Sequence, residues 1–264
     1  MSKKSDSPKL DRQLVQRLHR ALTASSEDLY QVLQDPAMEV IRSALKNPHL
    51  NEEHLLTLLK RRDLSEDIPK SLYKQEKVEL SHRLKLELVK NPSTPTPVRL
   101  TLLPQLRLFE LVNLLQLAGT TPDQKLAAER QIIKRLPTTP LGNKLTLARR
   151  SSTGILAELL KEGNPQVFAL CLANPRLKEV DIFKFLNSGR ANADTISQVA
   201  RHARWKNRPN LKLAILKNRQ TPSVWYTLWL PKLPSHELKN LLYGKQLSPH
   251  QKKLIKHEIS KRNL

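Results

Sequence analysis

The fold of this chain is decided by the stretch Leu88-Val89-Lys90-Asn91-Pro92-Ser93-Thr94-Pro95-Thr96-Pro97-Val98-Arg99-Leu100-Thr101-Leu102-Leu103-Pro104. It is typical of the end of one helix, a corner bounded by prolines, and the start of the next helix. Lysine in a last turn complements the negative end of the helix dipole, and asparagine tolerates the left-handed backbone that ends helices. Proline cannot continue a helix and restricts the residue before it. We predict that each Thr-Pro pair places threonine at the N-cap and proline at the first helical position. The Asn and Pro residues are therefore interpreted as structural.

Weaker copies of this corner recur along the chain. The equivalent positions are Asn47, Asn91, Leu136, Asn174 and Asn218, at intervals of 44, 45, 38 and 44 residues. A nearly constant interval of this size is typical of α-solenoids of the HEAT or armadillo kind. We therefore predict an all-α fold, a right-handed α-solenoid of about five repeats of roughly 44 residues.

A second internal similarity relates residues 102–126 to residues 229–253, at an offset of 127. In the first copy, proline breaks and helical spacing predict three helices, over residues 98–106, 108–117 and 123–136. The similarity predicts that this three-helix unit is duplicated. The matching segments are Leu102–Leu106 with Trp229–Leu233, Glu110–Leu115 with Glu237–Leu242, and Thr121–Leu126 with Ser248–Lys253.

The composition agrees with a helical fold and bounds the domain organisation. The chain of 264 residues has only 6 Gly, and leucine dominates its apolar residues, which favours helices over tight hairpins. The polar breaks are short enough to be loops between helices. We predict a disordered tail over residues 1–9 and a single α-helical repeat domain over residues 10–264.

Several classes of protein are excluded by what the sequence lacks. The single Cys171 allows neither a disulfide framework nor a cysteine-based metal site. No apolar run reaches the roughly 18 residues that a membrane span needs, and no apolar segment follows the N-terminal lysines. We predict a cytoplasmic protein with no membrane partner.

The run Val40-Ile41-Arg42-Ser43-Ala44-Leu45-Lys46-Asn47-Pro48-His49-Leu50-Asn51-Glu52-Glu53-His54-Leu55-Leu56 resembles the variant leucine-rich repeats of bacteria. The corners at 91–95 and 218–222 look like the same repeat corner. The resemblance covers about five corners and implies a helical superhelix without implying an activity. The iron–sulfur module of that family needs a cysteine cluster, which Cys171 alone cannot supply.

The charge is the strongest indication of function. The net charge is +22 and the isoelectric point about 10.3. Such a surface attracts polyanions, namely nucleic acid, an anionic membrane or an acidic protein. A lysine-rich surface that only aids solubility is the alternative reading.

Two stretches of the chain contain no acidic residue, from Arg130 to Ala157 and from Thr195 to His236, and the second holds all three tryptophans. Basic groups neutralise phosphates, and aromatic faces stack on unpaired bases. A single Lys or Arg is usually part of a solvated helix face, so the clustering without acids carries the prediction. The predicted nucleic-acid-binding residues are Arg201, Arg204, Trp205, Lys206, Arg208, Lys212, Lys217, Arg219, Lys134, Arg135, Lys144, Arg149 and Arg150.

The tryptophans also have a structural reading. Trp225 and Trp229 lie one helical turn apart and align with aliphatic residues of the other copy, which favours the core for both. Trp205 lies between Arg204 and Lys206, and its sequence context leaves core and base-stacking roles equally open.

The sequence gives little support for catalysis. It contains no Gly-rich phosphate loop and no hydrolase or metalloprotease motif, and we predict no enzyme activity, no cofactor, no metal site and no small-molecule substrate. The leading hypothesis is a non-enzymatic repeat protein that binds DNA or structured RNA through phosphate contacts in a basic groove. One alternative is a scaffold that binds an acidic segment of a protein partner. A further alternative is a HEAT-like alkylpurine DNA glycosylase, in which Trp205 and a carboxylate such as Asp181 or Asp194 would act on the lesion.

Overall fold

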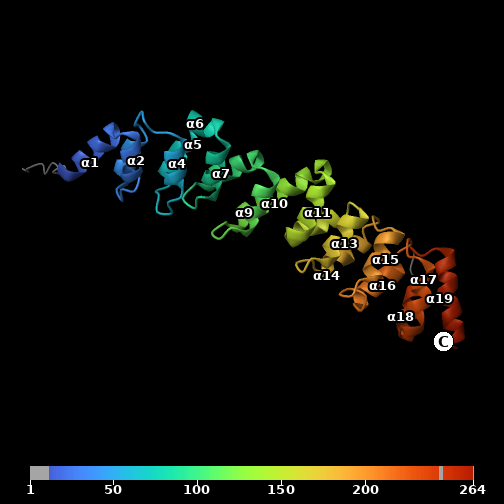
Figure 1. Cartoon of the computed structure of the whole chain (residues 1–264). Helices are drawn as coiled ribbons and strands as arrows, with labels where there is room; N and C mark the ends of the chain where they lie inside the picture. The colour runs from blue at the N-terminus through green and yellow to red at the C-terminus, as the bar shows by residue number, and fades with distance from the viewer. Residues whose placement is uncertain (1–11, 244–245, 264) are drawn as a thin grey trace, which may run out of the picture. The chain divides into compact units, whose positions relative to one another are not determined.

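The computed structural model describes residues 12–243 and 246–263, and these residues form nineteen α-helices and three short 3-10 segments without any strand (Figure 1). The all-α prediction is confirmed. The predicted tail over residues 1–9 lies outside the described residues. The chain divides into two compact units, the first ending at Gln131 and the second beginning at Ile132, inside helix α10. The prediction of a single repeat domain stays a prediction.

The helices of the first unit are short, and α7, α9 and α10 each end within one residue of the predicted position. Their bounds are α1 Arg12–Thr23, α2 Ser26–Val32, α3 Met38–Ala44, α4 Glu52–Leu59, α5 Asp67–Tyr73, α6 Glu76–Leu80, α7 His82–Lys90, α8 Thr96–Leu102, α9 Leu108–Gln116 and α10 Pro122–Arg135. A 3-10 segment, Leu103–Gln105, follows α8 at the predicted proline break.

The second unit also consists of short helices joined by short connections. Its helices are α11 Leu141–Arg150, α12 Thr153–Leu160, α13 Pro165–Ala173, α14 Glu179–Leu186, α15 Ala193–Arg201, α16 Pro209–Lys217, α17 Ser223–Trp229, α18 Ser235–Leu242 and α19 Pro249–Lys261. The other two 3-10 segments are Leu136–Thr138 and Leu230–Lys232.

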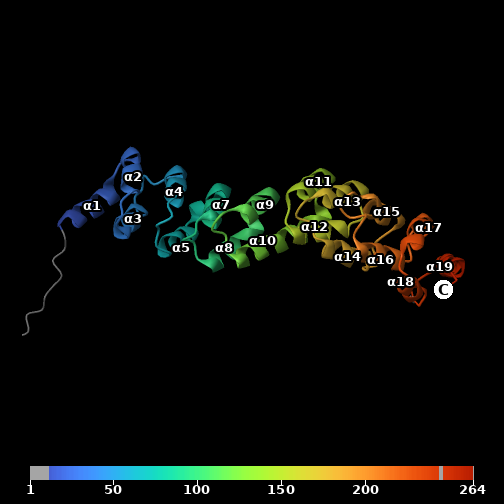
Figure 2. The same cartoon turned by 90° about the horizontal axis from the view of Figure 1, so that it is seen from below.

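From α11 to α16, each helix of the second unit packs against the next helix but one. Helices α11, α13 and α15 form one row, and α12, α14 and α16 form the other (Figure 2). The core lies between the rows, where the rings of Phe168 on α13 and Phe185 on α14 are 5.1 Å apart and both residues are buried. Alternate packing recurs in the first unit, where α1 packs on α3 and α2 on α4.

The asparagine of each corner binds backbone carbonyls at the end of the helix beside it. Asn47, Asn91 and Asn174 are buried, and their amide groups each donate to two carbonyls, while Asn218 donates to one. The Oδ1 atom of each accepts from the backbone N–H two residues later. These bonds satisfy helix-end carbonyls that have no partner within their own helix. These contacts bear out the structural interpretation of the asparagines. The left-handed backbone expected for them is wrong, because Asn91, Asn174 and Asn218 have φ angles of −73°, −69° and −84°.

The 44-residue interval from Asn174 to Asn218 spans three helices, α14 to α16, whereas the packing there advances by two. Asn174 ends α13 and Asn218 ends α16, and these helices belong to different rows. These two corners, which match in sequence, therefore lie at the ends of helices in different rows. Basic residues placed at the same point of the 44-residue interval consequently do not share one face.

The predicted threonine N-caps are wrong at these corners. Helix α8 follows the N-cap Pro95, and α17 follows the N-cap Pro222, so each helix begins one residue later than predicted. The hydroxyl of Thr221 instead donates to the carbonyl of Ile215, at the end of the preceding helix. Thr221 thus supplies a hydrogen-bond donor to a carbonyl at the end of α16. The N-terminus of α17 has no side-chain cap.

The predicted duplication agrees with the element bounds. Helix α8 and its 3-10 segment cover 96–105, and α17 with its 3-10 segment covers 223–232, which is the same pair at an offset of 127. Gln124 on α10 and Gln251 on α19 are equivalent. The Nε2 of Gln124 donates to the carbonyl of Val89, and that of Gln251 donates to carbonyls of the corner at 218–221.

One pair of equivalent positions differs in chemistry. Tyr226 is buried and donates its hydroxyl to the carbonyl of Leu216, whereas Arg99 takes the same place in the first copy and is also buried. The guanidinium of Arg99 donates to the neutral oxygens of Gln124 and Thr96, its Nε has no partner, and burial lowers its pKa. A buried cation that contacts no carboxylate opposes folding.

We expect Arg99→Met to raise the free energy of unfolding of the first unit by about 1–2 kcal/mol, because an aliphatic chain fills the site without a charge. Urea denaturation followed by circular dichroism measures this. Arg62→Met, at an exposed position, serves as the control and should change stability by less than about 0.5 kcal/mol. A loss of stability in Arg99→Met would contradict the argument.

Cys171 on α13 is buried, and burial raises the pKa of its thiol to about 12. The thiolate is the reactive form, so the folded protein should resist alkylation. We expect iodoacetamide at pH 8 to leave Cys171 unmodified in the native protein and to modify it fully in about 6 M guanidinium, which unfolds the chain. Mass spectrometry measures the difference, and rapid native labelling would show that the site opens.

Candidate nucleic-acid interface

The positive charge is concentrated in the second unit. Residues 132–264 contain 25 Lys and Arg against 7 Asp and Glu, a net charge of +18, while residues 1–131 contain 21 against 17, a net of +4. The excess of the whole chain, +22, therefore lies almost entirely in one of its two compact units. A local concentration of one sign raises the electrostatic potential far more than the same charge spread over the chain.

The few carboxylates of the second unit neutralise few of these cations. Glu162 pairs with Lys144 at 2.9 Å, and Glu158 and Glu258 pair with cations on their own helices. Glu179 lies 3.7 Å from Arg208. Cations that are exposed and have no carboxylate partner within the described residues include Lys134, Arg149, Lys178, Lys206, Lys217 and Arg219.

Three connections between helices lie side by side at one edge of the second unit. They are the α11–α12, α13–α14 and α15–α16 connections, at 151–152, 174–178 and 202–208. The Nη1 of Arg176 donates to the carbonyl of Arg150 at 2.9 Å, and the Nη1 of Arg204 donates to the carbonyl of Asn174 at 2.9 Å. These bonds tie each connection to the next. We call the cations gathered here the basic edge: Arg149, Arg150, Arg176, Lys178, Lys206 and Arg208.

Trp205 does not stack on bases, because it is buried with an exposed fraction of only 2%. Its indole N–H donates to the carbonyl of Leu172 at 2.9 Å, and the guanidinium of Arg204 covers its ring at 4.2 Å. Of the two roles left open for Trp205, the core role holds. Trp225 is buried as well, and Trp229 is half-buried against it, with ring centroids 5.1 Å apart.

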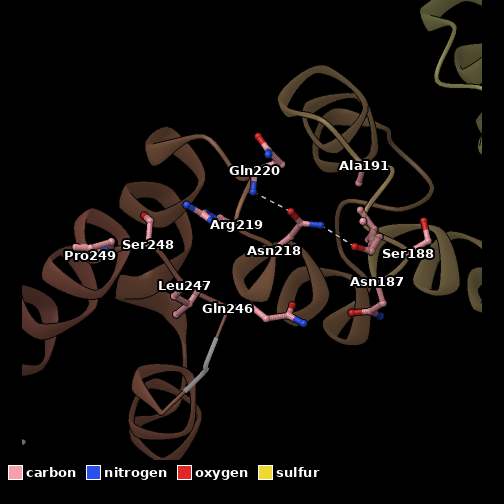
Figure 3. A pocket seen from close by; sticks show the side chains of 12 residues that line it. Asn187, Ser188, Ala191, Asn218, Arg219, Gln220, Gln246, Leu247, Ser248 and Pro249 are labelled. Carbon is pink, nitrogen blue, oxygen red and sulfur yellow. Dashed lines mark hydrogen bonds between the residues drawn. The ribbon is translucent and has the colours of Figure 1, made fainter.

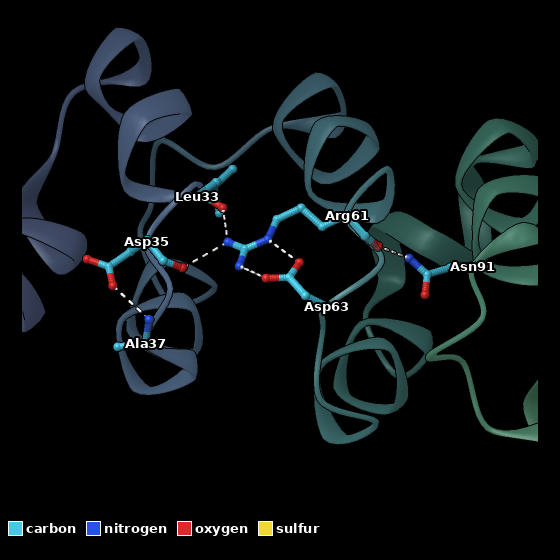
Figure 4. Close-up of polar contacts among 6 residues, drawn as sticks. All are labelled: Leu33, Asp35, Ala37, Arg61, Asp63 and Asn91. Carbon is cyan, nitrogen blue, oxygen red and sulfur yellow. Dashed lines mark hydrogen bonds and ion pairs between the residues drawn. The ribbon is translucent and has the colours of Figure 1, made fainter.

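Arg204 is a structural residue rather than a free phosphate-binding one. Its two Nη atoms donate to the carbonyls of Asn174, Pro175 and Leu177. Figure 4 shows the same use of an arginine in the first unit, where Arg61 donates to the carbonyls of two earlier residues. A guanidinium with five donors in a fixed fork suits this role, because it satisfies several carbonyls at once. Sequence alone does not distinguish such an arginine from a solvated one.

The other predicted residues are spread over the unit. Lys144 is engaged with Glu162 and is mostly buried, so the prediction that it binds nucleic acid is not supported by its position. Arg201 lies over the ring of Trp225 and the half-buried Lys212 over that of Trp229, each at 5.9 Å. Lys134 and Arg135 lie in the last turn of α10. This helix is not next in sequence to the basic edge and supplies none of the three connections that form it.

Lys217 and Arg219 lie at the end of α16, where a different set of loops meets. Arg219 lines a cavity of about 620 Å³ formed by the α14–α15, α16–α17 and α18–α19 connections (Figure 3). Asn218 occupies the middle of this cavity wall and donates to the carbonyl of Leu186. The acid-free stretch around Trp205 therefore supplies residues to two separate groups of loops.

Sequence reasoning missed Arg176 and Lys178. They follow the Asn174-Pro175 corner, and their neighbours Glu179 and Asp181 interrupt the acid-free pattern that was used to find the site. Asp181, however, accepts a hydrogen bond from Thr153 and so is partly engaged. The corner itself is the signal that could have found them, because it places two cations in a loop beside the ends of other helices.

The described residues show no grouping of three or more His, Cys, Asp or Glu side chains that could hold a metal ion. Trp205 is buried and cannot reach a base, so it cannot act on a lesion as the glycosylase alternative requires.

None of the helices in the described part of the chain is long and apolar enough to cross a membrane. The chain matches no protein-family model, and neither the curated proteins nor the solved structures contain a match to it.

Proposed function

We propose that the second unit binds nucleic acid, DNA or structured RNA, through the phosphates, with the basic edge as the main contact surface. The observation that carries the proposal is the gathering of six cations in a unit of net charge +18, two at the end of α11 and four on the adjacent α13–α14 and α15–α16 connections. Lysine and arginine that neutralise phosphates release condensed counterions, which drives association. Binding to phosphate is independent of sequence, so little preference among sequences is expected.

The local architecture supports a stacked-helix, solenoid-like arrangement for this surface. Each added pair of helices contributes one more connection to the same edge, so the edge grows with the stack. A right-handed solenoid is the proposed finer fold, with two helices per packing step. The burial of Trp205 and Trp225 supports contacts to the backbone rather than stacking on unpaired bases.

Titration of fluorescently labelled 20-base-pair DNA and RNA duplexes with the full chain tests the proposal. If the six cations of the basic edge contact phosphates, affinity should fall about a thousandfold between about 50 and 200 mM salt. Absence of binding at low salt would overturn the proposal. A polyglutamate peptide that binds more tightly than either duplex at matched salt would overturn it in favour of an acidic protein partner.

A further inference from the structure

A cavity of about 640 Å³ lies at the basic edge. Residues from the α11–α12, α13–α14 and α15–α16 connections line it, so it lies where the three connections meet. Its volume falls within the range of sites that hold small molecules. The cavity is therefore large enough for one nucleotide-sized group.

The cavity carries more positive than negative side chains. Arg176, Lys178, Arg204 and Arg208 line it, with Glu179 as the only acidic residue among the described lining residues. Among the described residues Lys178 has no polar partner for its side chain, Arg176 uses only its Nη1, and the 3.7 Å between Arg208 and Glu179 exceeds a hydrogen bond. Three cations thus retain free N–H donors toward an anion.

The cations at the helix starts are unusual. Lys178 is the N-cap of α14 and Arg208 is the N-cap of α16, and neither side chain caps its helix. N-caps are normally Ser, Thr, Asp or Asn, and a positive side chain there faces the positive end of the helix dipole. A bound anion would offset this repulsion at both positions. The cationic side chains give the cavity most of its positive charge, and the positive ends of the α14 and α16 dipoles add to it.

The remaining wall is formed by the hydroxyl residues Ser152 and Thr153, by apolar residues and by the Arg204–Trp205 pair. Pro175 and Leu177 line the cavity, and Leu177 is buried. The guanidinium of Arg204 lies over the Trp205 ring at 4.2 Å and is itself held by three carbonyls. A guanidinium plane fixed in this way can stack on a nucleobase. The cavity thus has a cationic part and a part with a flat guanidinium. The ligand that fits both parts is an anion with a flat ring.

We propose that this cavity holds a single unpaired nucleotide of a bound strand, with its phosphate on Arg176, Lys178 and Arg208 and its base against Arg204 and Pro175. The inference rests on the proposed function and adds a preference for an unpaired end or a flipped nucleotide. The basic edge alone gives no such preference, because phosphates are present on every strand.

Calorimetric titration of the full chain with adenosine 5′-monophosphate tests this inference. Adenosine and inorganic phosphate should each bind at least about tenfold more weakly, since each fills half of the cavity. Lys178→Gln should weaken binding of the monophosphate about tenfold, through loss of one charge-assisted contact. Lys184→Gln removes an equal charge from α14, outside both the cavity and the basic edge, and should change the affinity by less than about twofold.

Equal effects of Lys178→Gln and Lys184→Gln would overturn the inference, and so would tighter binding of a phosphoserine tetrapeptide than of the monophosphate. If the monophosphate does not bind while labelled duplex still binds in a salt-dependent way, the cavity inference fails and the proposed function stands. If neither the monophosphate nor the duplex binds, both the cavity inference and the proposed function are overturned.

Discussion

Replacing Asn174 by alanine is expected to lower the free energy of unfolding of the second unit by about 3 kcal/mol. The amide of Asn174 donates to the carbonyls of Ala148 at 2.8 Å and Arg149 at 3.1 Å, and its Oδ1 accepts from the backbone of Arg176 at 2.9 Å. The side chain is buried, with an exposed fraction of 5%. Alanine leaves the two carbonyls and the N–H without this partner, and unsatisfied buried polar groups are costly.

The measurement is urea denaturation followed by tryptophan fluorescence. All three tryptophans lie in the second unit, so the signal reports on that unit alone. The control is Asn240→Ala, on the exposed face of α18, where we expect a change below about 0.5 kcal/mol. Similar losses for the two alanine variants would show that the corner bonds do not stabilise the unit.

Asn174→Asp separates the donor from the acceptor role of the side chain. A carboxylate keeps the acceptor for Arg176 but cannot donate, and it places negative charge beside the carbonyls at the negative end of α11. At neutral pH we expect a loss of stability at least as large as that of Asn174→Ala. A stability equal to the wild type would mean that only the turn at Arg176 depends on this residue.

Much of the local structure could be predicted from the sequence because it depends on neighbouring residues. The stop at Asn91-Pro92 and the break at Pro104 lie where the structure places a helix end and a 3-10 segment. The 127-residue offset is reproduced in the bounds of α8 and α17. These features follow from the restricted backbone of proline and from helix-end hydrogen bonding, which act within a few residues.

The packing could not be read in the same way, because it depends on which helices touch. A 44-residue interval suggested equivalent faces, yet Asn174 and Asn218 end helices in different rows. The site shows the same limit. Arg204 and Lys206 look alike in sequence, but Arg204 binds three carbonyls and Lys206 is exposed without a partner. Only the contacts of the folded chain separate a structural arginine from a free cation.

The largest effect on binding is expected from neutralising the exposed part of the basic edge. Arg149, Lys178 and Lys206 are exposed, and their side chains have no partner in the described part of the chain, so changing all three to glutamine should leave the fold intact. Each lost phosphate contact lowers the slope of log affinity against log salt by about 0.9. The triple variant should therefore lower the slope by about 2.7 and weaken duplex binding at low salt by at least about tenfold.

The matched control removes the same charge from the other unit. Arg62, Lys70 and Lys74 are exposed and without a polar partner, and their change to glutamine also lowers the net charge by three. If net charge alone attracts the duplex, both triple variants should weaken binding equally. If phosphates contact the basic edge, the control should keep the wild-type salt slope and lose about twofold in affinity or less, because distant exposed charges are screened beyond about 10 Å. Equal slopes in the two variants would move the contact surface away from the basic edge.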